Sequence, residues 1–298
     1  MSVSRKKRAK PKATPRTEPP VFLDQNDVEE LLALLVESAQ PDDSIQAAQN
    51  IMYDAWDATG RRKRIALAQK ALQVSPLCAD AYVLLAQEKA KSAEDALALF
   101  RMGAEVGKQA LGSAGLKEYK GHFWGALETR PYMRALHGLG LTLSDLGQHQ
   151  EAIDIYREML RLNPNDNQGI RYLLAESLLA RDDITPLKKL LKKYKGDASA
   201  QWLYTQALLA FRDKAPNANA LAEEAWEANS HVPDMLSGDR PLVQSDTGYI
   251  RAGGDDEASF CVEAIGAAWR STPGAIAWLK ELTGKCEIPN WHSRLADK

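Results

Sequence analysis

Apolar residues recur every three or four positions through most of this chain, in short stretches that come in pairs. Positions i, i+3, i+4 and i+7 lie on one face of an α-helix, so this spacing predicts amphipathic helices. The clearest pair spans residues 130–164. Leu136 and Leu139 mark its first helix, and Tyr156 marks its second. We therefore expect an all-α protein that is built from helical hairpins.

Small residues occupy two positions of this central pair, Gly140 in the first helix and Ala152 in the second. Two helix backbones approach closely only where small side chains face each other, so we expect the helices to touch at these positions. A unit of roughly 34 residues with this arrangement, closed by Asn163-Pro164, is typical of the tetratricopeptide repeat (TPR). TPR hairpins stack side by side because each buries its apolar face on its neighbours.

The same pattern recurs on both sides of the central pair, and we predict a TPR-type α-solenoid of about five helical hairpins. A helix that opens at Asp24 or Asn26 is expected to cap the N-terminal end of the array. A pair of helices over 255–283 is expected to close the C-terminal end. The expected hairpins span residues 45–74, 82–107, 130–164, 167–196 and 200–233.

We place a single continuous solenoid domain at residues 21–285. The segment near 109–129 breaks the repeat, and long structureless connections are uncommon in compact domains. We interpret this insertion as a plug that packs over the stack, although its Trp124 and the neighbouring Arg130 also suit a binding lip. The other predicted segments are a disordered basic tail at 1–20, an irregular segment at 234–252 and a C-terminal tail at 286–298.

Charge is distributed unevenly along the chain. The 298 residues have a formal net charge of −2, yet the first 18 carry seven Lys or Arg and one Glu, which leaves −8 on the rest. An acidic body disfavours broad nucleic-acid binding, because phosphate recognition needs a basic face. Four lysines in one predicted helix lie opposite its leucines, and we expect them to form a solvated outer face. These are Lys188, Lys189, Lys192 and Lys193.

No pattern in the sequence indicates catalysis, a cofactor or a metal. We find no phosphate-binding GxxxxGK[ST] loop, no GxSxG elbow and no HExxH motif, so we expect no enzymatic activity. Cys78, Cys261 and Cys286 stand far apart, as expected for buried thiols in a reducing compartment. No apolar run is long enough to span a membrane and no signal peptide is evident, so we expect a cytoplasmic protein without membrane partners.

Three stretches outside the common TPR pattern resemble a known family. Residues 71–107, 227–236 and 253–279 are similar, in that order, to the TPR region of the suppressor of tumorigenicity seven-like proteins. The resemblance covers roughly residues 60–283. It implies a TPR architecture and a role in protein interaction, and it implies no known catalytic residue.

The concave face of a TPR array is lined by the first helix of each hairpin, and polar residues there that are not needed for packing are candidates for binding. Arg134 and Arg171 lie about one repeat apart, so we expect both guanidinium groups in one groove, where they could grip a carboxylate. The alternative is that they are solvated or pair with local acids. The full predicted partner-binding set is Arg134, His137, Asp145, Gln168, Arg171 and Trp124.

These patterns favour a non-catalytic scaffold that binds a peptide or a partner protein in its concave groove. The alternative is a factor associated with RNA or the ribosome, tethered by the basic N-terminal tail. The two differ in their salt dependence, because only the second relies on phosphate contacts.

Overall fold

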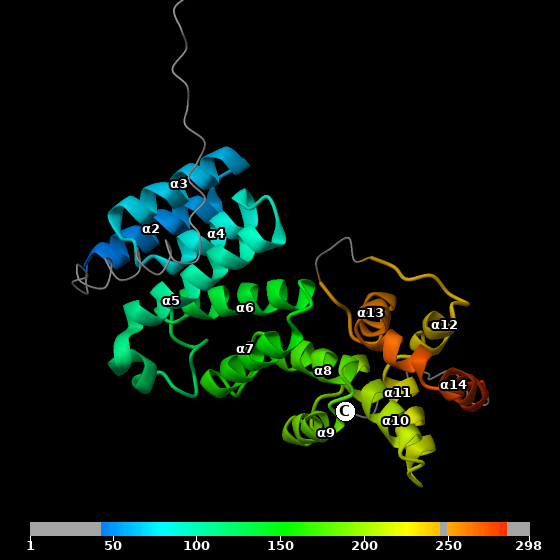
Figure 1. Cartoon of the computed structure of the whole chain (residues 1–298). Coiled ribbons are helices and arrows are strands. Elements are labelled where there is room, and N and C mark those ends of the chain that lie inside the picture. The colour runs from blue at the N-terminus through cyan, green and yellow to red at the C-terminus, as the bar shows by residue number, and fades with distance from the viewer. Residues whose placement is uncertain (1–42, 245–248, 285–298) are drawn as a thin grey trace, which may run out of the picture. The chain divides into compact units, whose positions relative to one another are not determined.

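The computed structural model describes residues 43–244 and 249–284. This part of the chain folds into thirteen α-helices, labelled α2 to α14 in Figure 1, and contains no strand. The described helices belong to one compact unit that begins at Asp43. The all-α prediction is confirmed. The predicted N-terminal capping helix, the basic tail and the C-terminal tail lie outside the described residues.

Ten of the helices form five consecutive hairpins, as the spacing of apolar residues predicts. Helices from successive hairpins contact each other at α3 and α4, at α5 and α6, and at α7 and α8. The hairpins are α2 (Asp43–Asp57) with α3 (Arg61–Val74), α4 (Ala79–Lys89) with α5 (Ala93–Glu118), α6 (Arg130–Asp145) with α7 (His149–Leu162), α8 (Ile170–Ala180) with α9 (Ile184–Lys193), and α10 (Ala200–Arg212) with α11 (Ala218–Ala228).

The central hairpin packs through the small residues that the sequence singled out. Gly140 on α6 is so close to α7 that a Cβ atom there would lie 2.5 Å from Cε1 of Tyr156. Ala152 on α7 is fully buried, and Tyr156 is only 1% exposed. A larger side chain at Gly140 would therefore displace the Tyr156 ring, which confirms the predicted site of close approach.

The predicted insertion near 109–129 begins with a kink. Helix α5 is interrupted at Gly112, whose φ is 59°, and a further helical segment then continues to Glu118. The segment after α5 packs on the array: Phe123 is fully buried, and the Gly121 N–H donates to the carbonyl of Leu162 at 2.8 Å. The plug interpretation is therefore correct for Phe123, whereas the neighbouring Trp124 is only half-buried.

The outward lysines of α9 are exposed, while Leu187, Leu190 and Leu191 on the same helix are buried. The expected solvated face is confirmed, because the helix separates its charged and apolar sides.

Three further helices follow the hairpins: α12 (Val232–Ser237), α13 (Asp255–Ser271) and α14 (Ala275–Thr283). The segment that was expected to be irregular from residue 234 starts with the short helix α12. The predicted C-terminal pair is present as α13 and α14, but α13 also contacts α8 and α10 (Figure 1). None of the helices in the described part of the chain is both long and apolar enough to cross a membrane.

Candidate functional site

The helices α2, α4, α6, α8 and α10 are the first helices of the five hairpins, and we call the surface that they form the first-helix face. In a TPR array this surface is the one that receives ligands. Helix α13 contacts α8 and α10, so it covers this part of the face, the covered half (Figure 1). Helix α4 contacts both α2 and α6, and the three helices line a cavity; we call this part of the face the open half.

The cavity of the open half has a volume of about 720 Å³. Two large hydrophobic side chains are exposed at its rim: Trp56 on α2 is 39% exposed and Leu141 on α6 is 37% exposed. Its floor is the Phe100 ring, which lies against the Gly138 backbone so closely that a Cβ there would be 2.2 Å from the ring. The lining residues are Trp56, Val83, Gln87, Phe100, Arg134, His137, Gly138, Leu141 and Thr142.

Beneath this cavity a buried carboxylate joins the three helices. Asp80 on α4 is fully buried, and it accepts hydrogen bonds from Nε2 of Gln49 on α2 at 2.8 Å and from Nε of Arg134 on α6 at 2.8 Å. A second guanidinium nitrogen of Arg134 bonds the other carboxylate oxygen at 2.5 Å. This bidentate pair fixes the arginine side chain. Arg134 therefore satisfies an internal acid, as the alternative from the sequence allowed, and its charge is not free to grip a ligand carboxylate.

His137 lies one helical turn from Arg134 and also lines the cavity. Burial lowers the pKa of this imidazole below its ordinary 6.5. Burial thus favours the neutral imidazole, which offers one N–H donor and one acceptor to a ligand.

Arg171 and Gln168 lie elsewhere, where the chain enters α8. Nε of Arg171 pairs with Asp197 at 2.5 Å, and another guanidinium nitrogen pairs with Asp166 at 2.9 Å. Burial alone would raise the pKa of Asp197, but hydrogen bonds from Ser199 and Arg171 outweigh it and lower that pKa. The expectation that both arginines face one groove is therefore wrong, because each is held by its own acids.

The other predicted residues are also dispersed. The amide oxygen of Gln168 is buried and accepts no hydrogen bond from the described residues. Asp145 is exposed at the last residue of α6. Trp124 lies outside the cavity lining, and Nε of Arg130 donates to its carbonyl at 3.1 Å. Of the predicted set, the structure brings together only Arg134 and His137.

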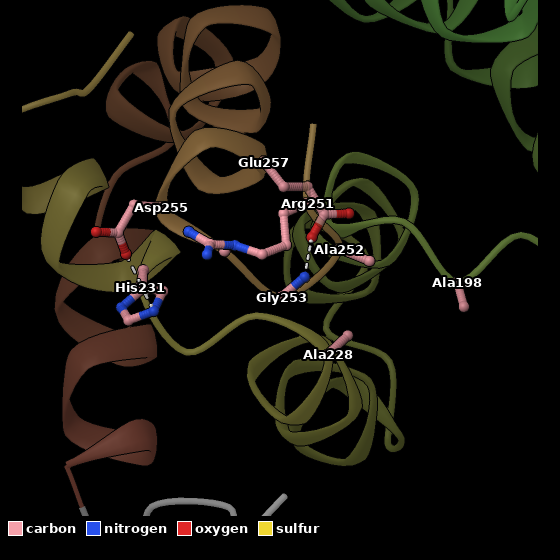
Figure 2. Close-up of a pocket in the computed structure, with 9 residues that line it drawn as sticks. Ala198, Ala228, His231, Arg251, Ala252, Gly253, Asp255 and Glu257 are labelled. Atoms are coloured by element: carbon pink, nitrogen blue, oxygen red, sulfur yellow. Dashed lines mark hydrogen bonds and ion pairs between the residues drawn. The ribbon is translucent and has the colours of Figure 1, made fainter. Parts of the chain in front are cut away.

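The start of α13 is held in place by a carboxylate that connects three segments. Glu257 accepts a hydrogen bond from the Gly253 N–H at 2.7 Å (Figure 2). It also accepts from the Ala200 N–H at 3.1 Å and from Nδ2 of Asn229 at 3.0 Å. The Ala200 N–H belongs to the first turn of α10, so this contact satisfies a helix terminus that has no internal partner.

A second acid at the same end of α13 pairs with residues of the segment around α12. Asp255 contacts Nε2 of His231 at 3.1 Å (Figure 2), and it also forms an ion pair with Arg240. The two acids border a cavity of about 500 Å³. Two of the non-repeat stretches from the sequence, around residues 227–236 and 253–279, meet here: Asp255 and Glu257 of the second bond to His231 and Asn229 of the first.

The end of α13 is held by an arginine from α10. Arg212 donates from Nε to Oγ1 of Thr272 at 2.9 Å and from another nitrogen to the Ala268 carbonyl at 3.2 Å. A cation at the C-terminus of a helix also complements its macrodipole. Between the two ends, Trp269 is fully buried and packs edge-on against Tyr204 of α10, with ring centroids 6.2 Å apart. The covered half is thus closed by specific contacts along the length of α13.

Sequence reasoning missed Trp56 and Gln87 as lining residues of the open half. A signal for Trp56 was available, because it lies off the stripe of Ala48, Met52 and Ala55 that α2 buries. A large aromatic residue outside the buried stripe of a helix is a candidate contact residue.

Comparison with known proteins gives a consistent result. The family described as ST7 protein matches residues 18–286. The suppressor of tumorigenicity 7 protein-like of Bos taurus is 26% identical over 262 residues, which are 80% of this chain and 47% of that protein. The protein of that name from Danio rerio is 27% identical, over 78% of this chain and 43% of its own length. The suppressor of tumorigenicity 7 protein of Macaca fascicularis is 25% identical, over 78% of this chain and 52% of its own length.

The chain therefore spans about half the length of the curated relatives it matches. Among solved structures, the protein YrrB, described as a TPR protein with an unusual peptide-binding site, is similar with a TM-score of 0.42. It is 17% identical, and the match covers 67% of this chain and 92% of that chain.

Proposed function

This chain belongs to the ST7 protein family, and from that premise we propose that it is a non-catalytic cytoplasmic scaffold that binds a peptide or partner protein in the open half. The observation that carries the proposal is the cavity of about 720 Å³ across α2, α4 and α6, with exposed apolar residues at its rim. Clustered exposed apolar side chains on a folded surface mark sites of interaction.

The contrast with the rest of the first-helix face supports this assignment. The covered half buries its apolar side chains under α13, whereas Trp56 and Leu141 of the open half have no such cover among the described residues. An aromatic residue and a leucine beside neutral polar groups provide the apolar centre and the hydrogen bonds that an interface needs.

The described cysteines do not require an oxidising compartment. Cys78 and Cys261 are unpaired and buried, and burial raises the pKa of the Cys78 thiol to about 12. Both thiols therefore remain protonated and unreactive at neutral pH.

Quantitative affinity purification tests the proposal, with the full chain and two matched variants. Leu141→Glu places a charge in the open half, and Phe260→Glu places the same charge on α13, where Phe260 is 43% exposed. Proteins that bind the open half should be retained by wild type and by Phe260→Glu, and reduced at least about tenfold by Leu141→Glu. Equal capture by all three chains would contradict the proposal.

The same experiment distinguishes the alternative of an RNA- or ribosome-associated factor. Binding through phosphate contacts would weaken steeply between about 50 and 200 mM salt and would not respond to Leu141→Glu. Binding in the open half should change little over this range, because its lining is mostly apolar and the charge of Arg134 is paired with Asp80.

A further inference from the structure

We propose that the ligand of the open half is an amphipathic α-helix whose apolar face packs against α2, α4 and α6. This inference rests on the proposed function and specifies the class of ligand. It is drawn from the way the molecule covers the other half of its own first-helix face.

Helix α13 is the template, because it is a helix that already lies on two first helices. Its buried residues recur at helical spacing, and Phe260 is on its outward side at 43% exposure. Helix α13 also contacts α12, but the part of its apolar face that lies on α8 and α10 shows that first helices of this array accept the apolar face of a helix. The buried residues of α13 are Ala258, Ser259, Cys261, Val262, Ile265, Gly266 and Trp269.

The hydrogen-bonding groups of the open half favour a helix over an extended peptide. An extended segment must find partners for its own backbone N–H and C=O groups, whereas a helix satisfies them internally. The backbones of α2, α4 and α6 are already bonded within their helices. Among the side chains, Thr142 donates to the Gly138 carbonyl at 2.8 Å and Arg134 is bonded to Asp80. Among the residues that line the cavity, this leaves Gln87, His137, the indole N–H of Trp56 and the outer edge of Arg134, too few to pair the backbone of an extended segment.

The charges of the open half favour an apolar contact face on the ligand. The positive charge of Arg134 is matched by Asp80, and burial lowers the pKa of His137, which favours its neutral form. Nearby on α4, Glu88 pairs with Arg64 at 2.6 Å. Since these charges are compensated, the binding energy comes from apolar burial, with polar contacts that set the register of the helix.

The size of the face sets the length of the ligand. Packed helices lie about 8–10 Å apart, so three adjacent first helices extend over about 20 Å between their outer axes. At 1.5 Å per residue, a helix of roughly 12–14 residues crosses this distance. Its contact residues should recur at i, i+3 or i+4, and i+7, as in α13.

Selection from a displayed library of 16-residue peptides tests this inference. The full wild-type chain is the target, and peptides that also bind Leu141→Glu are removed. In the selected peptides, apolar residues at i, i+3 or i+4, and i+7 should be more frequent than in the unselected library. Synthetic versions should gain helical circular dichroism when they bind. Both chains are first compared by thermal unfolding, and Leu141→Ala is used if the charged variant is unstable.

Proline substitution in the winning peptide provides the decisive measurement. Proline at the centre of a bound helix removes a hydrogen bond and clashes with the preceding turn, so affinity should fall roughly 100-fold. Proline at the first position of the same helix is the matched control, and it should be tolerated.

The possible failures are distinguishable. Winners that require Leu141 but tolerate a central proline would show that the open half binds an extended peptide, which overturns the helix inference and leaves the proposed function standing. If the selection yields no peptide that binds wild type and fails to bind Leu141→Glu, both the inference and the proposed function are overturned.

Discussion

The two halves of the first-helix face are built from the same kind of helix, yet one has its apolar surface covered by another helix and the other leaves it exposed. In the covered half, α13 lies on α8 and α10 and is held at both ends, by Glu257 and by Arg212. In the open half, a buried acid, Asp80, joins three helices from beneath and leaves Trp56 and Leu141 at the surface. Each hairpin of a repeat array thus presents a similar surface. The additional contacts that each surface makes decide whether it packs within the fold or is left for a ligand.

The largest expected effect is on stability, in the covered half. Trp269→Ala removes a fully buried ring that packs against Tyr204 and Trp278. We expect it to lower the free energy of unfolding by about 3–5 kcal/mol, from urea titrations followed by circular dichroism. Phe260→Ala on the same helix is the control and should change stability by no more than about 0.5 kcal/mol. Equal effects of the two variants would mean that α13 does not pack on α10 as described.

Gly140→Leu tests the packing beneath the open half. The added side chain must displace the Tyr156 ring, so we expect a loss of about 1–3 kcal/mol or more. Asp145→Leu introduces the same side chain at an exposed position of the same helix, and it should be nearly neutral. A wild-type melting temperature for Gly140→Leu would show that α6 and α7 do not meet at this residue.

Arg134→Ala distinguishes a structural arginine from a free ligand-binding one. It leaves the Asp80 carboxylate buried without its charged partner, so we expect a loss of about 1–3 kcal/mol in the free energy of unfolding. Arg101→Ala is the control, because Arg101 forms an exposed pair with Glu151 that should contribute no more than about 1 kcal/mol. Unchanged stability of Arg134→Ala would support the original expectation that this residue has no packing role.

The smallest expected effect is the pH dependence of binding in the open half. The pKa of His137 is already lowered by burial, and a bound helix would bury the imidazole further. The complex therefore favours the neutral form, so affinity is full above the pKa of the free protein and falls as pH drops through it. This direction is opposite to that expected for a protonated His137 that binds an anion. Titration of a selected peptide from pH 8 to 5.5 measures it.

His137→Gln is the control for this titration, because glutamine keeps a donor and an acceptor and does not titrate in this range. Its affinity for the peptide should not depend on pH. If wild type and His137→Gln weaken in parallel, another group is responsible for the pH dependence.

The sequence by itself determined the parts of this protein that depend on local periodicity. Apolar residues at helical spacing predict the five hairpins, and the small residues Gly140 and Ala152 predict where α6 and α7 touch. Pro131 at the start of α6 and Pro186 in the first turn of α9 agree with this reading, because proline is tolerated where the N–H has no helical partner. These features follow from neighbours within about one hairpin, which the order of residues specifies directly.

The partners of charged groups were decided only by the tertiary structure. Arg134 pairs with an acid 54 residues away and Arg171 with one 26 residues away. Helix α13 shows an apolar stripe like that of the other helices, and periodicity alone does not indicate which surface it covers. Its position depends on contacts such as Glu257 with Ala200, 57 residues apart. Such contacts form only when the chain brings distant backbone and side-chain groups within hydrogen-bonding distance, and no local pattern encodes that distance.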